Sequence, residues 1–418
     1  MKASTIAVVA AVAVAVGGVV VMSGVLEPSY ETSAVDQRGA ALDTQLVERG
    51  KYLVRAGDCM ACHTSADGAS FAGGVPLPTP FGTIYGTNIT PDQEYGIGSW
   101  NSADFYKALH DGVTPEHPLY PAMPYTSYRG LSREDSDAIF AYLQTVEPAP
   151  VRNRENGVPF PLNFRPLLRG WNFLFLSDTL PAVSKGDSQE WVRGRYLVNV
   201  LGHCTECHTP RGMVGQLKLG DSFQGGAAEA IHAPDITPAS LAARGWTVEH
   251  LRQFLAKGIA PQGSAYGGMY DAFHHSTRYL SEADNKAMVT YLTGDAPSVA
   301  VALKPADGAQ GETLRAGRQH YLALCAGCHA AQGQGKPNVT VALAGNSTVR
   351  NPDPHNLLYV MLNGLGKKDF PGNQGRQAMP GFAGALDDAQ VAELANYLRV
   401  EFGGQKGDVS AKTVQALR

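Results

Sequence analysis

Six cysteines place the strongest constraint on this 418-residue sequence, because all of them fall in three copies of one pentapeptide. The pattern is Cys-x-x-Cys-His, and its copies span residues 59–63, 204–208 and 325–329. This pentapeptide is the attachment signature of c-type haem. Its two sulfurs reach the two vinyl groups of one haem, and the next residue, His, points back at the iron. The sequence therefore predicts three covalently bound haems c. The predicted attachment residues are Cys59, Cys62, Cys204, Cys207, Cys325 and Cys328, and the predicted proximal iron ligands are His63, His208 and His329.

Other uses of paired cysteines explain this pattern less well. A structural zinc site closes four ligands around the metal, usually from two Cys-x-x-Cys pairs, whereas here each pair is followed by His and the pairs lie far apart. A thioredoxin-like redox pair accounts for neither the repeated His nor the lack of a β-α-β pattern. A disulfide framework suits an exported chain, but it would not place every Cys in the same pentapeptide.

The repeat extends beyond the pentapeptide, which indicates a tandem arrangement. A Gly-basic-Tyr-Leu-Val segment precedes the first two motifs at residues 50–54 and 194–198, and a looser copy precedes the third at 317–321. Downstream, Asn-Ile-Thr-Pro at 88–91 corresponds to Asp-Ile-Thr-Pro at 235–238. Every copy closes with an apolar helical pattern that ends in Tyr-Leu. These features predict an all-α fold with three tandem cytochrome c-type domains, each a small helical bundle around one haem.

Linker segments at 147–150 and 297–308, each of which contains proline, mark the boundaries between the repeats. The predicted organisation is a signal or membrane anchor at 1–35, cytochrome c domains at 36–150, 187–298 and 299–405, a linker at 151–186 and a tail at 406–418. The linker contains an apolar, aromatic cluster between residues 167 and 176. This cluster fits packing between domains, and it also fits an interfacial or partner-docking surface near a membrane.

The second axial ligand decides what a haem of this kind does. With only the proximal His the iron keeps an open position, whereas a Met thioether closes it and raises the potential, as in an electron carrier. Met123 and Met379 each stand in an Ala-Met-Pro segment, and Pro keeps the residue before it extended. Met269 lacks the Pro but stands 61 residues after His208, against 60 from His63 to Met123. The predicted distal ligands are therefore Met123, Met269 and Met379, with His274 and His275 as competitors of Met269.

The N-terminus carries an uncharged run from Ile6 to Leu26. Its 21 residues match the roughly 20 that a helix needs to cross the hydrocarbon core. A secretory signal has a shorter apolar region of about 7–15 residues, followed by a small-residue cleavage site, and here the small-x-small patterns lie inside the run. The run therefore favours an N-terminal membrane helix, with a removed signal as the alternative. Both predict that the rest of the chain is exported to the periplasmic side of the inner membrane.

The charge balance and the missing motifs exclude several classes of protein. The 34 basic and 38 acidic residues nearly cancel, and no basic block of the kind that binds nucleic acid is present. The sequence also contains neither a nucleotide-binding glycine fingerprint nor a catalytic triad. We therefore predict no catalytic residues, and we expect substrate oxidation to occur on another polypeptide.

The combined motifs resemble one family. The three-motif layout, the Thr-Asn-Ile-Thr-Pro segment at 87–91 with Trp100, and Ala-Met-Pro-Tyr at 122–125 are similar to those of trihaem cytochrome c subunits of membrane-bound periplasmic dehydrogenases. The resemblance covers roughly residues 40–405. It includes the subunits of quinoprotein alcohol dehydrogenases, of flavin-dependent gluconate, fructose and sorbitol dehydrogenases, and of molybdenum-dependent aldehyde dehydrogenases.

The resemblance implies a function and a set of partners. A subunit of this family takes electrons from a large dehydrogenase subunit, of quinoprotein, flavoprotein or molybdopterin type, and delivers them to ubiquinone in the membrane. The resemblance is also compatible with a small third subunit in the complex. Two alternatives are a cytochrome that feeds a terminal oxidase and a multihaem peroxidase. The peroxidase needs an open iron, for which the second repeat, with His274 and His275 beside Met269, is the candidate.

Overall fold

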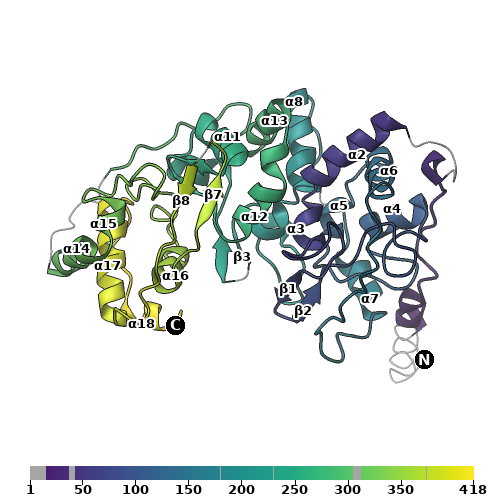
Figure 1. The fold of residues 1–418 in the computed structure, drawn as a ribbon, viewed down its shortest axis with the longest axis horizontal. Helices are drawn as coiled ribbons and strands as arrows, with labels where there is room; N and C mark the ends of the chain where they lie inside the picture. Colours follow the sequence, from purple (N-terminus) through teal and green to yellow (C-terminus); the bar gives the residue numbers. More distant parts are fainter. Residues whose placement is uncertain (1–15, 37–42, 179, 229, 305–311, 373) are drawn as a thin grey trace, which may run out of the picture. The chain divides into compact units, whose positions relative to one another are not determined.

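Short helices dominate the computed structural model, which describes residues 16–36, 43–178, 180–228, 230–304, 312–372 and 374–418 (Figure 1). The described residues also form four antiparallel two-stranded hairpins between these helices. The all-α class predicted from the sequence agrees with this content, although the hairpins were not predicted. The chain forms two compact units. The first contains residues 1–182, 195–206 and 212–216, and the second contains residues 183–194, 207–211 and 217–418.

The first unit contains the elements around the first motif. They are η1 (Ala34–Asp36), α2 (Thr44–Ala56), α3 (Cys59–His63), β1 (Pro76–Thr79), β2 (Gly82–Tyr85), α4 (Ser102–Asp111), α5 (Tyr125–Tyr128), α6 (Arg133–Leu143), α7 (Leu167–Phe175) and η2 (Leu197–Leu201). Two further helices, α8 (Gln189–Tyr196) and α9 (Thr205–His208), have residues in both units.

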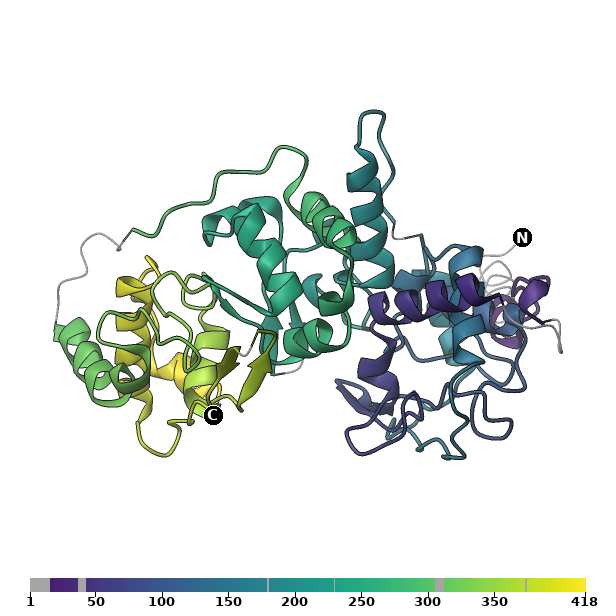
Figure 2. The same cartoon turned by 45° about the horizontal axis from the view of Figure 1, so that its top comes forward.

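The second unit contains the elements around the third motif and most of those that follow the second. They are η3 (Leu219–Asp221), β3 (Gly226–Ala228), β4 (Ile231–Ala233), α10 (Pro238–Ala243), α11 (Val248–Lys257), β5 (Ile259–Ala260), β6 (Gly263–Ser264), α12 (Gly268–His275), η4 (Thr277–Tyr279), α13 (Glu282–Thr293), α14 (Glu312–Leu324), α15 (Ala326–His329), α16 (His355–Asn363), β7 (Lys368–Phe370), β8 (Gln374–Arg376), α17 (Asp388–Glu401) and α18 (Ala411–Gln415). Figure 2 shows the extended segment that follows α13.

The first and last helices of each repeat cross at a glycine. A Cβ atom added to Gly50 of α2 would lie 1.8 Å from the carbonyl oxygen of Ala138 in α6. The two other crossings place Gly194 of α8 on Ala287 O at 1.9 Å and Gly317 of α14 on Glu393 O at 2.2 Å. Contacts this short leave no room for a side chain, so the two backbones touch. The glycine that recurs before each motif therefore sets the helix crossing of its repeat.

Arginine–aspartate pairs reinforce these crossings in the first two repeats. Ser132 caps α6 by accepting a hydrogen bond from the backbone N–H of Asp135, and Ser281 caps α13 in the same way with Asp284. Each aspartate then accepts a hydrogen bond from an arginine on the first helix of its repeat. Arg49 Nε lies 2.9 Å from Asp135 Oδ1, and Arg193 Nε lies 2.8 Å from Asp284 Oδ1. The serine thus caps one helix, and the aspartate in the first turn of that helix holds a second helix against it.

The predicted N-terminal membrane helix falls partly outside the described ranges, because its residues 6–15 precede the first of them. Residues 16–23 are helical. Among the described residues, no helix combines the length and the apolar character that crossing a bilayer requires. The chain after this helix is fastened to the first unit, where Tyr30 donates a hydrogen bond to Asp111 (2.8 Å) and Asp36 accepts one from the Ser102 amide (2.7 Å).

Candidate haem sites

The Cys-x-x-Cys-His motifs begin immediately after a sharp turn of the backbone in the first two repeats. Asp58, which precedes Cys59, has a φ of 55°, and His203, which precedes Cys204, has a φ of 36°. Residues with a side chain rarely adopt this left-handed conformation. The turn separates the first helix of the repeat from the short motif helix, so that His63 at the end of α3 becomes buried with 8 % of its surface exposed.

All three motif histidines use the same ring nitrogen in the same way. The Nδ1 atom of His63 lies 2.6 Å from Thr87 O, that of His208 lies 2.7 Å from Pro234 O, and that of His329 lies 3.1 Å from Val341 O. A carbonyl oxygen only accepts, so Nδ1–H is the donor in each case and the lone pair is left on Nε2. A second hydrogen bond of this kind orients metal-binding histidines generally.

The protonation of these histidines also suits iron. Burial lowers the pKa of His63, His208 and His329, although the carbonyl contact of each ring acts in the opposite direction. A neutral imidazole with a free Nε2 is the form that binds a metal ion. The donor set and its orientation therefore fit c-type haem at each motif. The three carbonyl partners were not predicted from the sequence. Two of them, Thr87 and Pro234, directly precede the repeated Asn-Ile-Thr-Pro and Asp-Ile-Thr-Pro segments.

The three predicted distal methionines lie in different local structures. Met123 stands in a turn before α5, where its amide donates to Tyr120 O (3.0 Å). Met379 forms an antiparallel bridge with Leu365. Met269, unlike the other two, lies within a helix, near the start of α12. All three are partly buried. Their ligation to iron remains a prediction.

The competing histidines lie at the far end of α12. His274 stacks on Tyr270 with ring centroids 5.5 Å apart and an angle of 16° between the rings. His275 lies edge-on to His274 at 4.9 Å. Met269, by contrast, packs against the apolar cluster formed by Ala265, Tyr270, Phe273 and Phe370. The apolar surroundings of Met269 suit a thioether.

One tyrosine contacts residues that adjoin both the first and the second motif. Tyr128 of α5 donates a hydrogen bond to Gly57 O (2.6 Å), two residues before Cys59. Its ring also lies edge-on to His203, directly before Cys204, with centroids 5.7 Å apart. Within the first unit, the two attachment segments are therefore joined through a single side chain. This contact was not predicted from the sequence.

The second and third repeats are joined within the second unit. The Asn356 side chain in α16 accepts from the backbone N–H of His232 (2.8 Å) and donates to its carbonyl oxygen (2.7 Å). The rings of His232 and His355 stack at 3.5 Å. The Asn356 amide thus makes the two backbone hydrogen bonds with His232 that a neighbouring strand would make along β4.

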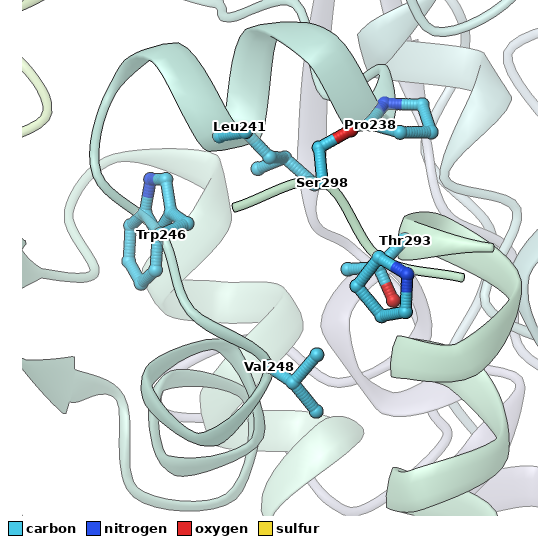
Figure 3. Close-up of a pocket in the computed structure, with 8 residues that line it drawn as sticks. Pro238, Leu241, Trp246, Val248, Thr293 and Ser298 are labelled. Carbon is cyan, nitrogen blue, oxygen red and sulfur yellow. The ribbon is translucent and has the colours of Figure 1, made fainter. Parts of the chain in front are cut away.

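A small pocket lies apart from these sites. Figure 3 shows Trp246 and Leu241 on one side of it, and Thr293 and Val248 on another. Its lining is Pro238, Leu241, Ala242, Trp246, Val248, Thr293, Pro297 and Ser298. None of the twelve predicted haem residues, all of which are described, belongs to it.

Comparisons with known proteins agree with the motif geometry. Residues 47–147 and 314–400 match the cytochrome c family model. The chain is 38% identical to the gluconate 2-dehydrogenase cytochrome c subunit of Pantoea cypripedii over 423 aligned positions, which cover 93% of this chain and 92% of that protein. It is 36% identical to the cytochrome c subunit of the quinone-dependent alcohol dehydrogenase of Gluconobacter oxydans, with 90% of this chain and 83% of that protein covered.

A third relative is much longer. A nicotinate dehydrogenase subunit of Pseudomonas putida is 37% identical over 86% of this chain, which spans only 31% of that protein. The matches over nearly full length are those to the dehydrogenase cytochrome subunits. The chain therefore belongs to the family of cytochrome c subunits of dehydrogenases, among which are those for alcohol, gluconate and fructose.

Proposed function

We propose that the chain is the electron-transfer subunit of a membrane-bound periplasmic dehydrogenase complex and passes electrons from a large dehydrogenase subunit through three haems c to ubiquinone. Each bound haem supplies one reversible one-electron couple. Oxidation of one substrate molecule releases two electrons and two protons, and ubiquinone takes up the same number when it becomes ubiquinol. The main support for this proposal is that the three motif histidines share one geometry. Their Nδ1 atoms lie 2.6, 2.7 and 3.1 Å from a backbone carbonyl oxygen.

The chain's own residues have a limited chemical task in this function. The six motif cysteines would hold the haems, with His63, His208 and His329 as proximal and Met123, Met269 and Met379 as distal ligands. The contacts of Tyr128 with Gly57 and His203 support a short step between the first two haems. The pairing of Asn356 with His232 supports close contact between the second and third repeats.

The ion pairs of Glu27 support membrane attachment. Its carboxylate accepts from Lys107 of α4 (2.8 Å) and Arg169 of α7 (2.6 Å), directly after the apolar run of the N-terminus. Helix α7 has no buried residue and exposes 70% of Phe173 and 69% of Leu174. An apolar helix fastened to the end of a membrane anchor suits the interface of a bilayer. We infer that α7 lies on the membrane surface.

The first experiment isolates the native complex in mild detergent and identifies the large subunit bound to this chain. Candidate alcohols, aldehydes and sugars are then added in turn, and haem reduction is followed by absorbance, before and after addition of a ubiquinone analogue. We expect one substrate class to reduce the haems and the quinone to reoxidise them. Recovery of the chain alone, or with a copper–haem oxidase subunit, would contradict the proposal.

Flotation with liposomes tests the membrane part separately. The double variant Phe173→Ser/Leu174→Ser is compared with Met213→Ser, which alters a residue with 97% exposure outside α7. We expect the double variant to float less completely than the wild type and Met213→Ser to float like it. Equal flotation of all three proteins would show that α7 does not contribute to membrane attachment.

A further inference from the structure

A group of buried and partly buried polar side chains lies between the second and third repeats, within the second unit. Ser347 Oγ accepts hydrogen bonds from Arg244 Nη1 (3.0 Å) and Trp246 Nε1 (3.1 Å). Nearby, Tyr266 Oη lies 2.9 Å from the Thr348 hydroxyl. Across the same boundary, Arg376 of β8 donates through Nη1 to the hydroxyl of Ser264 in β6. Arginines thus join the two repeats without any carboxylate in these contacts.

Of the arginines in this group, Arg376 has the fewest N–H groups that donate a hydrogen bond to a protein acceptor. Its exposed fraction is 6%, and its Nε atom is buried without a hydrogen-bond partner. No Asp or Glu of the described residues forms an ion pair with it. Burial lowers the pKa of its guanidinium, and the neighbouring Tyr266 and Tyr270 act in the opposite direction. A buried cation without a counter-ion is costly, so an anion is expected beside it.

The register of the repeats relates this arginine to the predicted distal ligands. Ser264 and Tyr266 stand five and three residues before Met269, and Arg376 stands three residues before Met379. Arg376 and Tyr266 therefore hold the same position in successive repeats. Both flank the segments that are predicted to bring a thioether to iron, and so they adjoin the predicted haem sites.

An arginine from outside the repeat approaches the corresponding position in the first repeat as well. Tyr120 and Pro118 stand three and five residues before Met123. Arg165, from the linker, donates through Nη1 to Pro118 O (3.1 Å), and its guanidinium lies 4.0 Å from the centre of the Tyr120 ring. The arrangement thus occurs twice, with arginines from unrelated segments. A role tied to the haem explains this recurrence better than local packing.

We propose that Arg376, although it belongs to the third repeat, binds a propionate carboxylate of the haem held by the second motif. The inference rests on the proposed function, because it requires that haem to be present. A guanidinium presents several N–H groups in one plane, which match a carboxylate. Nη1 is engaged by Ser264, and Nε remains free to donate. The cation would also favour the reduced, less positive state of the nearby iron and so raise its potential.

The test measures the potentials of the three haems in the detergent-solubilised complex by spectroelectrochemical titration over a series of pH values. Met269→His first identifies the second haem, because replacement of a thioether by an imidazole lowers the potential. We expect Arg376→Met to lower the potential of that same haem and to make it vary with pH, since the released propionate would titrate. Arg376→Lys should keep most of the wild-type potential, because it retains the charge.

Arg350→Met is the matched control. Arg350 is equally buried in the same unit, but its Nη2 donates to the carbonyl oxygens of Ala243 (2.6 Å) and Val301 (3.0 Å). We expect it to lower the stability without a selective change of one potential. A shift in the third haem instead of the second, an equal shift of all three, or none in Arg376→Met would overturn the inference. The proposed function would instead fail if mass spectrometry found no haem on the peptide with Cys204 and Cys207.

Discussion

At the scale of single residues, each motif histidine is oriented by a backbone group and not by a side chain. The oxygen atoms that hold His63, His208 and His329 are backbone carbonyls of Thr, Pro and Val. Any residue offers such an oxygen, so sequence patterns locate the histidine but not the group that orients it. The distal side is different, because the iron there requires a particular side chain. Substitution is therefore informative on the distal side.

Replacement of Met123 tests the closed coordination of the first haem. In the wild type we expect slow and incomplete binding of carbon monoxide to the reduced protein, because a thioether occupies the sixth position of each iron. Met123→Ala should convert one of the three haems to rapid binding. Met213→Ala, at a residue with 97% exposure, serves as the control. Rapid binding to all three haems of the wild type would contradict six-coordinate iron and would favour the peroxidase alternative.

Asp111 provides a pH-dependent contribution to the stability of the first unit. Burial alone would raise the pKa of Asp111, but hydrogen bonds from His110 and Tyr30 and the charge of Arg129 bring the pKa below its usual value of 3.8. A carboxyl with a lower pKa in the folded state stabilises the protein above its unfolded pKa, and this contribution is lost as the pH falls through the folded pKa.

We therefore expect the thermal midpoint of the first unit to fall below about pH 4. Asp111→Asn should lower the midpoint at neutral pH and make it less sensitive to acid. Calorimetry from pH 7 to pH 3 measures both effects. Asp67→Asn is the control, because Asp67 is exposed. An acid-induced fall of the same size in Asp111→Asn and the wild type would show that this carboxyl does not contribute.

At the scale of elements, the glycine crossings determine how each repeat closes. A Cβ on Gly50 would lie 1.8 Å from Ala138 O, so Gly50→Ala must separate α2 from α6. We expect it to destabilise the first unit by about 1–3 kcal/mol, as overpacking of a core does. Gly170→Ala in α7, where an added Cβ meets nothing within 4 Å, should stabilise its helix by about 0.5–1 kcal/mol. Thermal unfolding of both variants gives the comparison, and equal effects would contradict the crossing.

These crossings were partly predictable from the sequence. The glycine before each motif and the Tyr-Leu pair of the closing helix recur at fixed places, and the structure brings them together: the Cβ of Tyr142 is the next contact of Gly50. The hairpins were not predictable, because strands of two to four residues are too short to show an alternating pattern. Arg376 was missed for a related reason, since its contact with Ser264 joins residues 112 positions apart.

At the scale of the whole molecule, the second and third repeats form one unit through the Asn356 amide. It replaces a strand partner for His232 at 2.8 and 2.7 Å. Asn356→Leu would leave both backbone groups of His232 without this partner, at a cost of about 1–3 kcal/mol for each unsatisfied group. We expect faster amide hydrogen exchange at residues 226–233 and earlier proteolysis between the repeats. Asn363→Leu, where the amide contacts only Tyr359 O, should leave both rates unchanged.

The contacts of Tyr128 bear on how a redox titration of this protein is interpreted. The same aromatic ring touches Gly57, beside the first attachment segment, and His203, beside the second. Two haem irons bound at these adjoining segments would sense each other's charge, so reduction of one would make reduction of the other less favourable. The two steps of the titration curve would then belong to the pair as a whole. A midpoint assigned to a single iron would describe a microstate in which its neighbour is held in one oxidation state.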